Sequence, residues 1–326
     1  MSVVVALPGL DAATYKPSVL HADDCIWVEK NCYIDIWIEV VHALGLEPVA
    51  MMPFTVALNF EDDQWTFFKP PHGELYDLYG IDVQELNVWR PLIDHALTHL
   101  RTKKLLATEA DAYWLPDTAG TDYRSQHTKT TIVIQSLDIE RRRLGYFHNA
   151  SYHELDGEDF ARLFRLGEPH DPAYMPFFAE LIRFDRKIAL SLDDLRARSR
   201  RHLRAHLERR PTDNPVARFG ARFPQDLTWV QREGLPFYHA WAFANLRQLG
   251  AAFELAARHA RWLDGEALAP AAEAFEALST QAKALVLKIA RAVNGKKALD
   301  AAATFDDMSA AYQRGIDVLV REVIAP

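Results

Sequence analysis

Two kinds of hydrophobic pattern divide the chain. Up to about residue 165, runs in which β-branched and aromatic residues alternate with polar ones predict strands between short helices; they read FTVALNF, WTFFK, LLATEADAYWL, TTIVIQSLDI and RLGYFHNASYHEL. Beyond Pro172 the chain is rich in Ala, Leu and Arg with a period of 3.6, which predicts helices. We place them at about 174–190, 192–209, 237–263, 267–293 and 305–323, with interruptions at Pro211, Pro215, Pro224 and Pro236.

These patterns predict the fold class and the domain boundary. The fold class is α+β, with an α+β domain at residues 1–168 followed by an all-α domain at residues 169–326. The segment LGEPHDPAYMP contains Pro169, Pro172 and Pro176 and is the expected junction.

The distribution of charge along the chain argues against nucleic-acid binding. The 326 residues carry 37 Lys/Arg and 45 Asp/Glu, a net charge of −8. Residues 1–170 hold 14 Lys/Arg against 26 Asp/Glu, or −12, and the remainder holds 23 against 19, or +4. Nucleic-acid binding depends on basic surfaces that neutralise phosphates, so an acidic first part makes nucleic acid an unexpected partner.

The cysteine count, the N-terminus and the absence of common motifs indicate where the protein is located and which cofactor chemistry is not expected. Two cysteines cannot form a disulfide framework or a typical structural zinc site. The N-terminus lacks the features of a signal peptide, and no apolar run approaches the roughly 18 residues that cross a bilayer. The sequence also lacks GxGxxG, GxxxxGK[ST], HExxH and GxSxG. We therefore expect a cytoplasmic protein with no membrane partner, no metal and no cofactor.

Cys32 is the first candidate for chemistry. In NCYIDIWIEVVHALGLEP, apolar residues recur at helical spacing and Gly45 stands where a C-terminal cap belongs, so a helix is predicted to start at about Asn31. A cysteine in the first turn lies among unpaired backbone N–H groups and at the positive end of the helix dipole, which favour a thiolate and can hold an oxyanion. The alternative interpretation is a small buried apolar residue.

His127 is the candidate base. It stands just before an alternating β-branched run, at the mouth of a predicted strand. The next strand ends at His148 and Asn149, and pairing of about 128–138 with about 143–149 in a hairpin brings Asn149 back towards the start of the His127 strand. We therefore predict Asn149 as the group that orients His127, with His148 as an alternative. Taken alone, His127 is equally a polar strand-end residue and Asn149 a turn former.

The order Cys32, His127, Asn149 on helix, strand and strand resembles papain-like cysteine enzymes. It resembles more closely the butirosin-biosynthesis acyltransferase BtrH group, in which an Asp-x-Tyr/Phe-x-Leu-Pro stretch precedes the His; here that stretch is Asp111, Tyr113, Leu115 and Pro116. The motifs ALPGL, NCYIDIWIEV, DQWTFFKPP, LYGIDVQELNVWRPL and LPDTAGTDYRSQHTKTT are similar to a bacterial domain family of unknown function, number eighteen thirty-nine.

The resemblance implies a papain-like fold and transfer of an acyl or aminoacyl group from a carrier-protein thioester to a small amine. It also implies that Asp111 and Tyr113 face the site, with Asp111 in contact with the acceptor amine; the alternative for Asp111 is a carboxylate bonded to backbone at a strand end. Glu109 lies on the same predicted strand face as Asp111, and two such carboxylates would attract a cationic amine. Papain-like enzymes keep a Gln before the nucleophile where this chain has Ile26, so the oxyanion donor is open among Asn31, Gln64 and His21.

The segment LRARSRRHLRAHLERR carries seven arginines and one Glu between residues 196 and 210. It is expected to be an ordinary solvated helix face or, in the functional interpretation, the dock of an acidic carrier protein through Arg200, Arg201 and Arg204.

These observations predict an acyltransferase that works through an acyl-cysteine intermediate. A cysteine peptidase or amidase of the same fold is the second candidate, because its nucleophile and base would be identical. A catalytically inert binding protein is the third.

Overall fold

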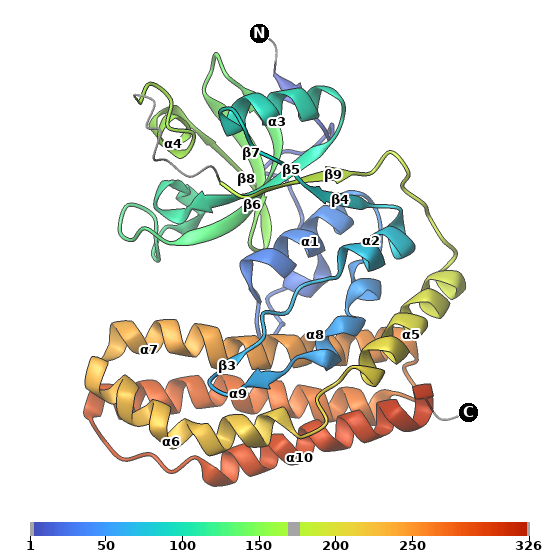
Figure 1. Cartoon of the computed structure of the whole chain (residues 1–326), viewed down its shortest axis with the longest axis vertical. Coiled ribbons are helices and arrows are strands. Elements are labelled where there is room, and N and C mark those ends of the chain that lie inside the picture. Colours follow the sequence, from blue (N-terminus) through green and yellow to red (C-terminus); the bar gives the residue numbers. More distant parts are fainter. Residues whose placement is uncertain (1–2, 169–176, 325–326) are drawn as a thin grey trace. The chain divides into compact units, whose positions relative to one another are not determined.

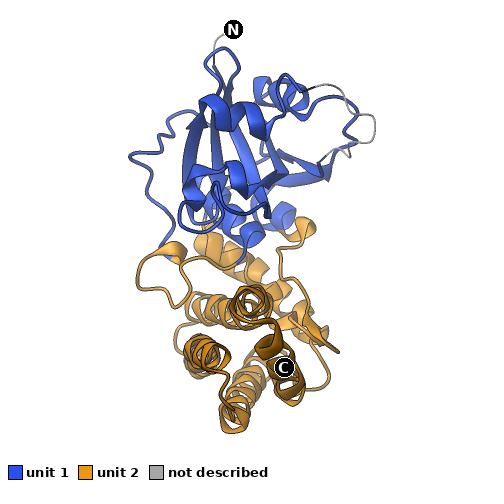
Figure 2. Cartoon of the chain, turned by 90° about the vertical axis from the view of Figure 1, so that its left-hand side faces the viewer, with its two compact units in different colours: residues 1–19, 31–46, 75–189 blue, residues 20–30, 47–74, 190–326 orange. Residues whose placement is uncertain are grey.

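The computed structural model describes residues 3–168 and 177–324, which form two compact units (Figure 2). The first unit comprises residues 1–19, 31–46 and 75–189, and the second comprises residues 20–30, 47–74 and 190–326. The chain therefore passes between the units several times in its first 75 residues. The predicted junction at 169–176 lies outside the described residues.

The first unit is built on an antiparallel sheet, so the predicted α+β class is confirmed. Among the described residues the sheet has seven strands in the order β4-β9-β5-β6-β7-β8, with β1 also paired to β6 (Figure 1). The strands are β1 (Val4–Val5), β4 (Asp82–Glu85), β5 (Leu105–Asp111), β6 (Lys129–Asp138), β7 (Arg143–His148), β8 (Ser151–Asp156) and β9 (Ala179–Arg183).

Helix α1 (Cys32–Ala43) packs against the centre of this sheet. It contacts β6 and β7, and its side chains Ile34, Trp37 and Val41 are fully buried. The unit also contains most of α2 (His72–Tyr79), whose first three residues belong to the second unit, together with α3 (Leu92–Arg101) and α4 (Gly157–Leu163). Nearly every residue of β6 is buried, which shows that both faces of the central strand are covered.

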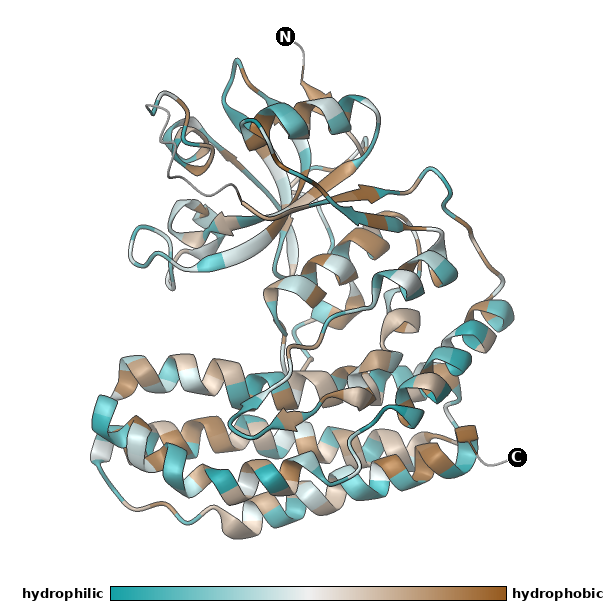
Figure 3. Ribbon diagram, viewed as in Figure 1, coloured by the Kyte–Doolittle hydropathy of each residue, from teal (hydrophilic) through white to brown (hydrophobic). Residues whose placement is uncertain are grey.

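The second unit is largely helical. It contains α5 (Leu192–Glu208), α6 (Pro215–Glu233), α7 (Leu235–Ala242), α8 (Gln248–Leu263), α9 (Ala269–Gly295) and α10 (Ala302–Leu319), with π-helical turns at Phe243–Arg247 and Val320–Ile324. Hydrophobic and hydrophilic bands alternate along these helices (Figure 3), which is the pattern of helices that bury one stripe. The unit also carries the short pair β2 (Phe60–Glu61) and β3 (Gln64–Trp65). None of the described helices has the length and apolar character needed to cross a membrane.

The structure differs from the sequence prediction at several elements. The helix expected at 174–190 is instead strand β9 at Ala179–Arg183, because pairing with β4 on one side and β5 on the other outweighs local helical propensity. The first four residues of the run FTVALNF belong to a 3-10 helix at Pro53–Ala57, started by the fixed φ of Pro53, and only its last residue, Phe60, lies in a strand. Pro224 lies inside α6 instead of interrupting it, so that helix was missed.

Candidate functional site

The N-terminus of α1 positions Cys32 as predicted. The Asn31 side-chain oxygen caps the helix by accepting the backbone N–H groups of Tyr33 at 3.1 Å and Ile34 at 2.9 Å. The backbone N–H of Cys32 itself has no acceptor among the described residues. Gly45 ends the helix with φ of 72°, in the left-handed region that favours glycine. Cys32 therefore combines a half-buried thiol with a free N–H at the positive end of a helix dipole.

The thiol of Cys32 points at the sheet. Its Sγ lies 3.9 Å from Oγ1 of Thr131 on β6, and within the described residues no other side chain hydrogen-bonds it. In the β5–β6 ladder, Thr131 stands opposite Glu109, and Lys129 stands opposite Asp111. Residues opposite each other in an antiparallel pair share a face of the sheet, and so do residues two apart on one strand. All four side chains therefore lie on the face on which Thr131 contacts Cys32.

His127 precedes β6 by two residues, and its ring is held by two neighbours. Nδ1 lies 2.7 Å from Oδ2 of Asp111, at the end of β5. The ring also stacks on Tyr113, with centroids 4.3 Å apart and planes 13° from parallel. Asp111 is itself fixed, because its Oδ1 accepts the backbone N–H of Tyr113 at 3.1 Å. With Nδ1 occupied and 69% of the side chain exposed, Nε2 of His127 is open to a reacting group.

Strand register relates the Cys32 contact to the His127–Asp111 pair. Thr131, which contacts the thiol, and Asp111, which contacts the imidazole, are diagonal neighbours across β5 and β6. Diagonal neighbours on one face are about 7–8 Å apart. The thiol and the Asp111 carboxylate that holds the imidazole thus face the same side of this ladder, and within the described residues no hydrogen bond joins Cys32 and His127.

The predicted orienting role of Asn149 is corrected. Strands β6 and β7 pair as predicted, but Asn149 has φ of 46° in the tight turn between His148 and Ser151. A short hairpin loop requires this left-handed conformation, which Asn tolerates better than most residues. Asn149 is therefore a turn former. The contact with His127 that was predicted for Asn149 is made by Asp111 instead.

His148 is also placed differently from its predicted roles in orienting His127 or binding substrate. It is 1% exposed, with Nδ1 2.5 Å from Oδ2 of Asp117 and Nε2 2.8 Å from Oγ1 of Thr130. Asp117 also accepts a hydrogen bond from the hydroxyl of Tyr146. This buried network fixes the segment that precedes His127 to β6 and β7.

The three proposed oxyanion donors belong to different units of the chain. Asn31 uses its side-chain oxygen as a helix cap, as described above. Gln64 is exposed on β3 and His21 is buried in a 3-10 turn, and both belong to the second unit. Which of the three would donate to an oxyanion stays a prediction, and the backbone N–H of Cys32 is a further candidate donor.

The predicted docking arginines lie on α5 in the second unit. Arg200 forms an ion pair with Asp264 at 3.3 Å, and Arg204 pairs with Glu208 one helical turn away at 3.4 Å. Arg201 is exposed. Their role in docking stays a prediction.

Family models match nearly the whole chain. The model of the DUF1839 N-terminal domain matches residues 16–184, and that of the DUF1839 C-terminal domain matches residues 193–321. The chain belongs to the DUF1839 family. This confirms the resemblance to this family that was drawn from the N-terminal motifs. The residues matched by the N-terminal model include Cys32, Asp111 and His127. A search of curated proteins found no match.

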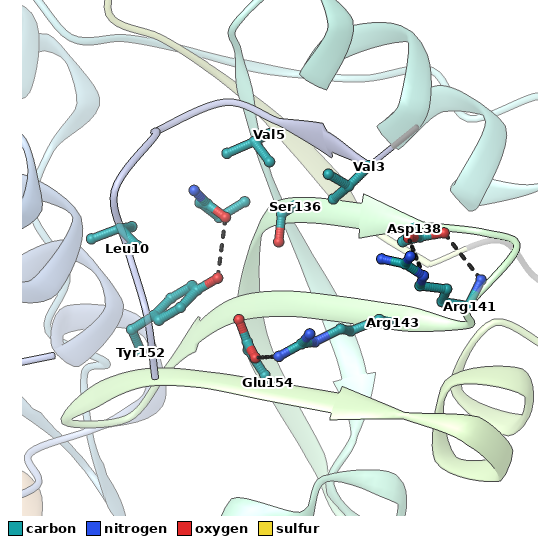
Figure 4. Close-up of a pocket in the computed structure, with 10 residues that line it drawn as sticks. Val3, Val5, Leu10, Ser136, Asp138, Arg141, Arg143, Tyr152 and Glu154 are labelled. Carbon is teal, nitrogen blue, oxygen red and sulfur yellow. Dashed lines mark hydrogen bonds and ion pairs between the residues drawn. The ribbon is translucent and has the colours of Figure 1, made fainter. Parts of the chain in front are cut away.

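A cavity of about 180 Å³ in the first unit is distinct from this site (Figure 4). Its wall is formed by the N-terminal segment and by strands β6 to β8, with Val3, Val5, Leu10, Gln135, Ser136, Asp138, Arg141, Arg143, Tyr152 and Glu154. At Gly145 on β7, a Cβ would come within 2.4 Å of Ser136 Oγ and 2.0 Å of Tyr152 Oη, two of the lining residues. Neither Cys32 nor His127 lines this cavity.

Sequence reasoning missed the contact between Asp111 and His127, although a signal for it was present. Asp111 ends one predicted strand and His127 precedes the next. Consecutive antiparallel strands bring the end of one beside the start of the other. The same logic had been applied only to the following hairpin.

Proposed function

We propose that this protein is a cysteine acyltransferase with a papain-like catalytic unit. The observation that carries the proposal is the placement of the Cys32 thiol and the His127–Asp111 pair on one face of the β5–β6 ladder. A helix that begins with a nucleophilic cysteine, packed on an antiparallel sheet beside a histidine at a strand mouth, is the arrangement of papain-like enzymes. The resemblance to the butirosin acyltransferases favours transfer over hydrolysis.

In the first half-reaction, Nε2 of His127 takes the proton of Cys32, and the thiolate attacks the carbonyl carbon of a thioester. The backbone N–H of Cys32 donates to the oxyanion of the tetrahedral intermediate. The intermediate collapses to acyl-Cys32, and the leaving thiolate takes the proton from His127. Asp111 holds the imidazole in the tautomer with hydrogen on Nδ1 and stabilises its charged form.

In the second half-reaction, a neutral amine attacks the acyl-Cys32 carbonyl while His127 removes its proton. The tetrahedral intermediate releases the Cys32 thiolate, which is reprotonated by His127. The product is an amide. If water replaced the amine the product would be a carboxylic acid, and the enzyme would be a hydrolase of the same chemistry.

The proposal is tested with small thioesters, each incubated with and without a panel of primary amines. We expect thiol release to depend on Cys32, and amide to exceed free acid when an amine is present. Free acid as the sole product with every amine would indicate the hydrolase, and no acylation of Cys32 by any thioester or amide would indicate an inert binding protein.

A carrier protein as the acyl donor is a further part of the proposal. Arg201 and Arg204 are exposed cations on α5 that suit an acidic partner. The variant Arg200→Glu/Arg201→Glu/Arg204→Glu should lose turnover with carrier-protein thioesters but retain turnover with small thioesters. Equal loss on both substrates would indicate misfolding, and no loss would leave α5 as a solvated surface.

A further inference from the structure

Glu109 is a carboxylate on the face of the β5–β6 ladder that Thr131 shares, and within the described residues it has no structural task. Asp111 uses one oxygen for the Tyr113 backbone and the other for His127. The Glu109 carboxylate has a single partner among the described residues, the ammonium of Lys129 at 3.3 Å. The Lys129 side chain is 67% exposed, and exposed pairs of this kind are worth about 0–1 kcal/mol. A substrate cation can therefore replace Lys129 at little cost.

Register places Glu109 beside an acyl group carried by Cys32. Glu109 stands directly opposite Thr131, and Oγ1 of Thr131 lies 3.9 Å from Sγ of Cys32. The Cβ atoms of directly opposed residues are about 4.5–5.5 Å apart. The Glu109 carboxylate thus lies within reach of the first atoms of an acyl chain bound to Sγ.

We infer that Glu109 binds an ammonium group on the acyl donor, so that the enzyme selects aminoacyl thioesters over uncharged acyl thioesters. This inference rests on the proposed function. The ammonium would sit on the α or β carbon of the acyl group. The acceptor amine is a poor match for Glu109, because the attacking nitrogen must be neutral and must approach the carbonyl carbon itself. A carboxylate that holds an ammonium to one side instead fixes the acyl group for attack.

The inference is tested with matched pairs of N-acetylcysteamine thioesters: glycyl against acetyl, and β-alanyl against propionyl. The measured quantity is the rate of Cys32 acylation, and the ratio of the charged to the uncharged member reports selection. We expect the wild-type protein to favour the charged member, and Glu109→Gln to lower that ratio about tenfold. Glu85→Gln is the matched control, because Glu85 is an exposed carboxylate of the same unit whose side chain has no partner among the described residues, and it should keep the wild-type ratio.

Lys129→Gln separates the carboxylate from the ion pair. Removing the competing ammonium should keep the ratio at or above that of the wild type, whereas a fall like that of Glu109→Gln would overturn the inference. A wild-type ratio near one, or a ratio unchanged by Glu109→Gln, would also overturn it. In those cases the proposed acyl transfer still stands, since it fails only if no thioester acylates Cys32.

Discussion

Nδ1 of His127 lies 2.7 Å from Oδ2 of Asp111, so in the proposed mechanism the group that orients His127 is a carboxylate at the end of β5. A carboxylate stabilises the imidazolium that forms when His127 takes a proton, whereas an amide only orients the ring. The pair therefore suits a base that must repeatedly gain and lose a proton.

The variants Asp111→Asn and Asn149→Gly distinguish the two candidate orienting residues. Asp111→Asn should lower acyl transfer by about 100-fold or more, because the amide neither fixes the tautomer nor stabilises the charge. Asn149→Gly should change the rate less than about threefold, since glycine readily adopts the left-handed turn. Steady-state turnover with a small thioester measures both, and a larger loss in Asn149→Gly would restore Asn149 to the site.

Iodoacetamide at pH 6.5 should label Cys32 at least about tenfold faster than Cys25. The Cys25 thiol donates to the carbonyl of Leu20 at 3.3 Å, is only 8% exposed, and burial raises its pKa. Cys32 is more exposed and opens α1. Peptide mapping after a short reaction gives the two rates, and faster labelling of Cys25 would contradict the assignment of the nucleophile.

The sequence was sufficient to predict the elements that carry the chemistry. Helical spacing after Asn31 predicted α1, and alternation after His127 predicted β6 and its pairing with β7. These signals are local or join neighbours in the chain. The position of β9 was not predictable in this way, because it enters the sheet between β4 and β5, far from both in sequence.

The details of the site were less predictable for a similar reason. The choice of Asp111 over Asn149 depends on which strand end lies beside His127. Both ends were available from the pattern, and only the register of β5 against β6 decides between them. The buried position of His148 depends on a contact with Asp117, which lies in a 3-10 turn at Pro116–Thr118 that is too short to give a periodic signal.

Asp117→Asn should lower the free energy of unfolding by about 2–4 kcal/mol at pH 7. Burial raises the pKa of Asp117, but the hydrogen bond and charge of His148 oppose this effect, and the net result is a lowered pKa. A lowered folded-state pKa adds stability above the unfolded value of about 3.9, and this stability is lost as the pH falls towards the folded value. Urea unfolding at several pH values should show the difference between variant and wild type shrinking below about pH 4. A difference that is small at pH 7, or constant with pH, would contradict this role.

His259 should make the second unit sensitive to mild acid. Burial lowers the pKa of His259 to about 3, and its Nε2 lies 2.8 Å from Oγ of Ser199. In the unfolded chain His259 binds a proton near pH 6.5, whereas in the folded chain it stays neutral down to about pH 3. The free energy of unfolding therefore keeps its full value above about pH 6.5 and falls as the pH drops towards 3. The slope from this one group approaches about 1.4 kcal/mol per pH unit.

Urea unfolding of His259→Gln between about pH 6 and pH 4 measures this contribution. The variant should have a shallower dependence of the unfolding free energy on pH, by about one proton, whatever its absolute stability. Equal slopes in variant and wild type would contradict a buried neutral histidine.

The most direct test of the Cys32–His127–Asp111 site is the covalent intermediate. Intact mass and peptide mapping after mixing with a small thioester should find one acyl group on Cys32 in the wild type and in Cys25→Ser, and none in Cys32→Ser. His127→Ala should form the adduct at least about 100-fold more slowly, because the thiol loses its base. An adduct on Cys25, or formation on Cys32 at a rate indifferent to His127, would contradict the account.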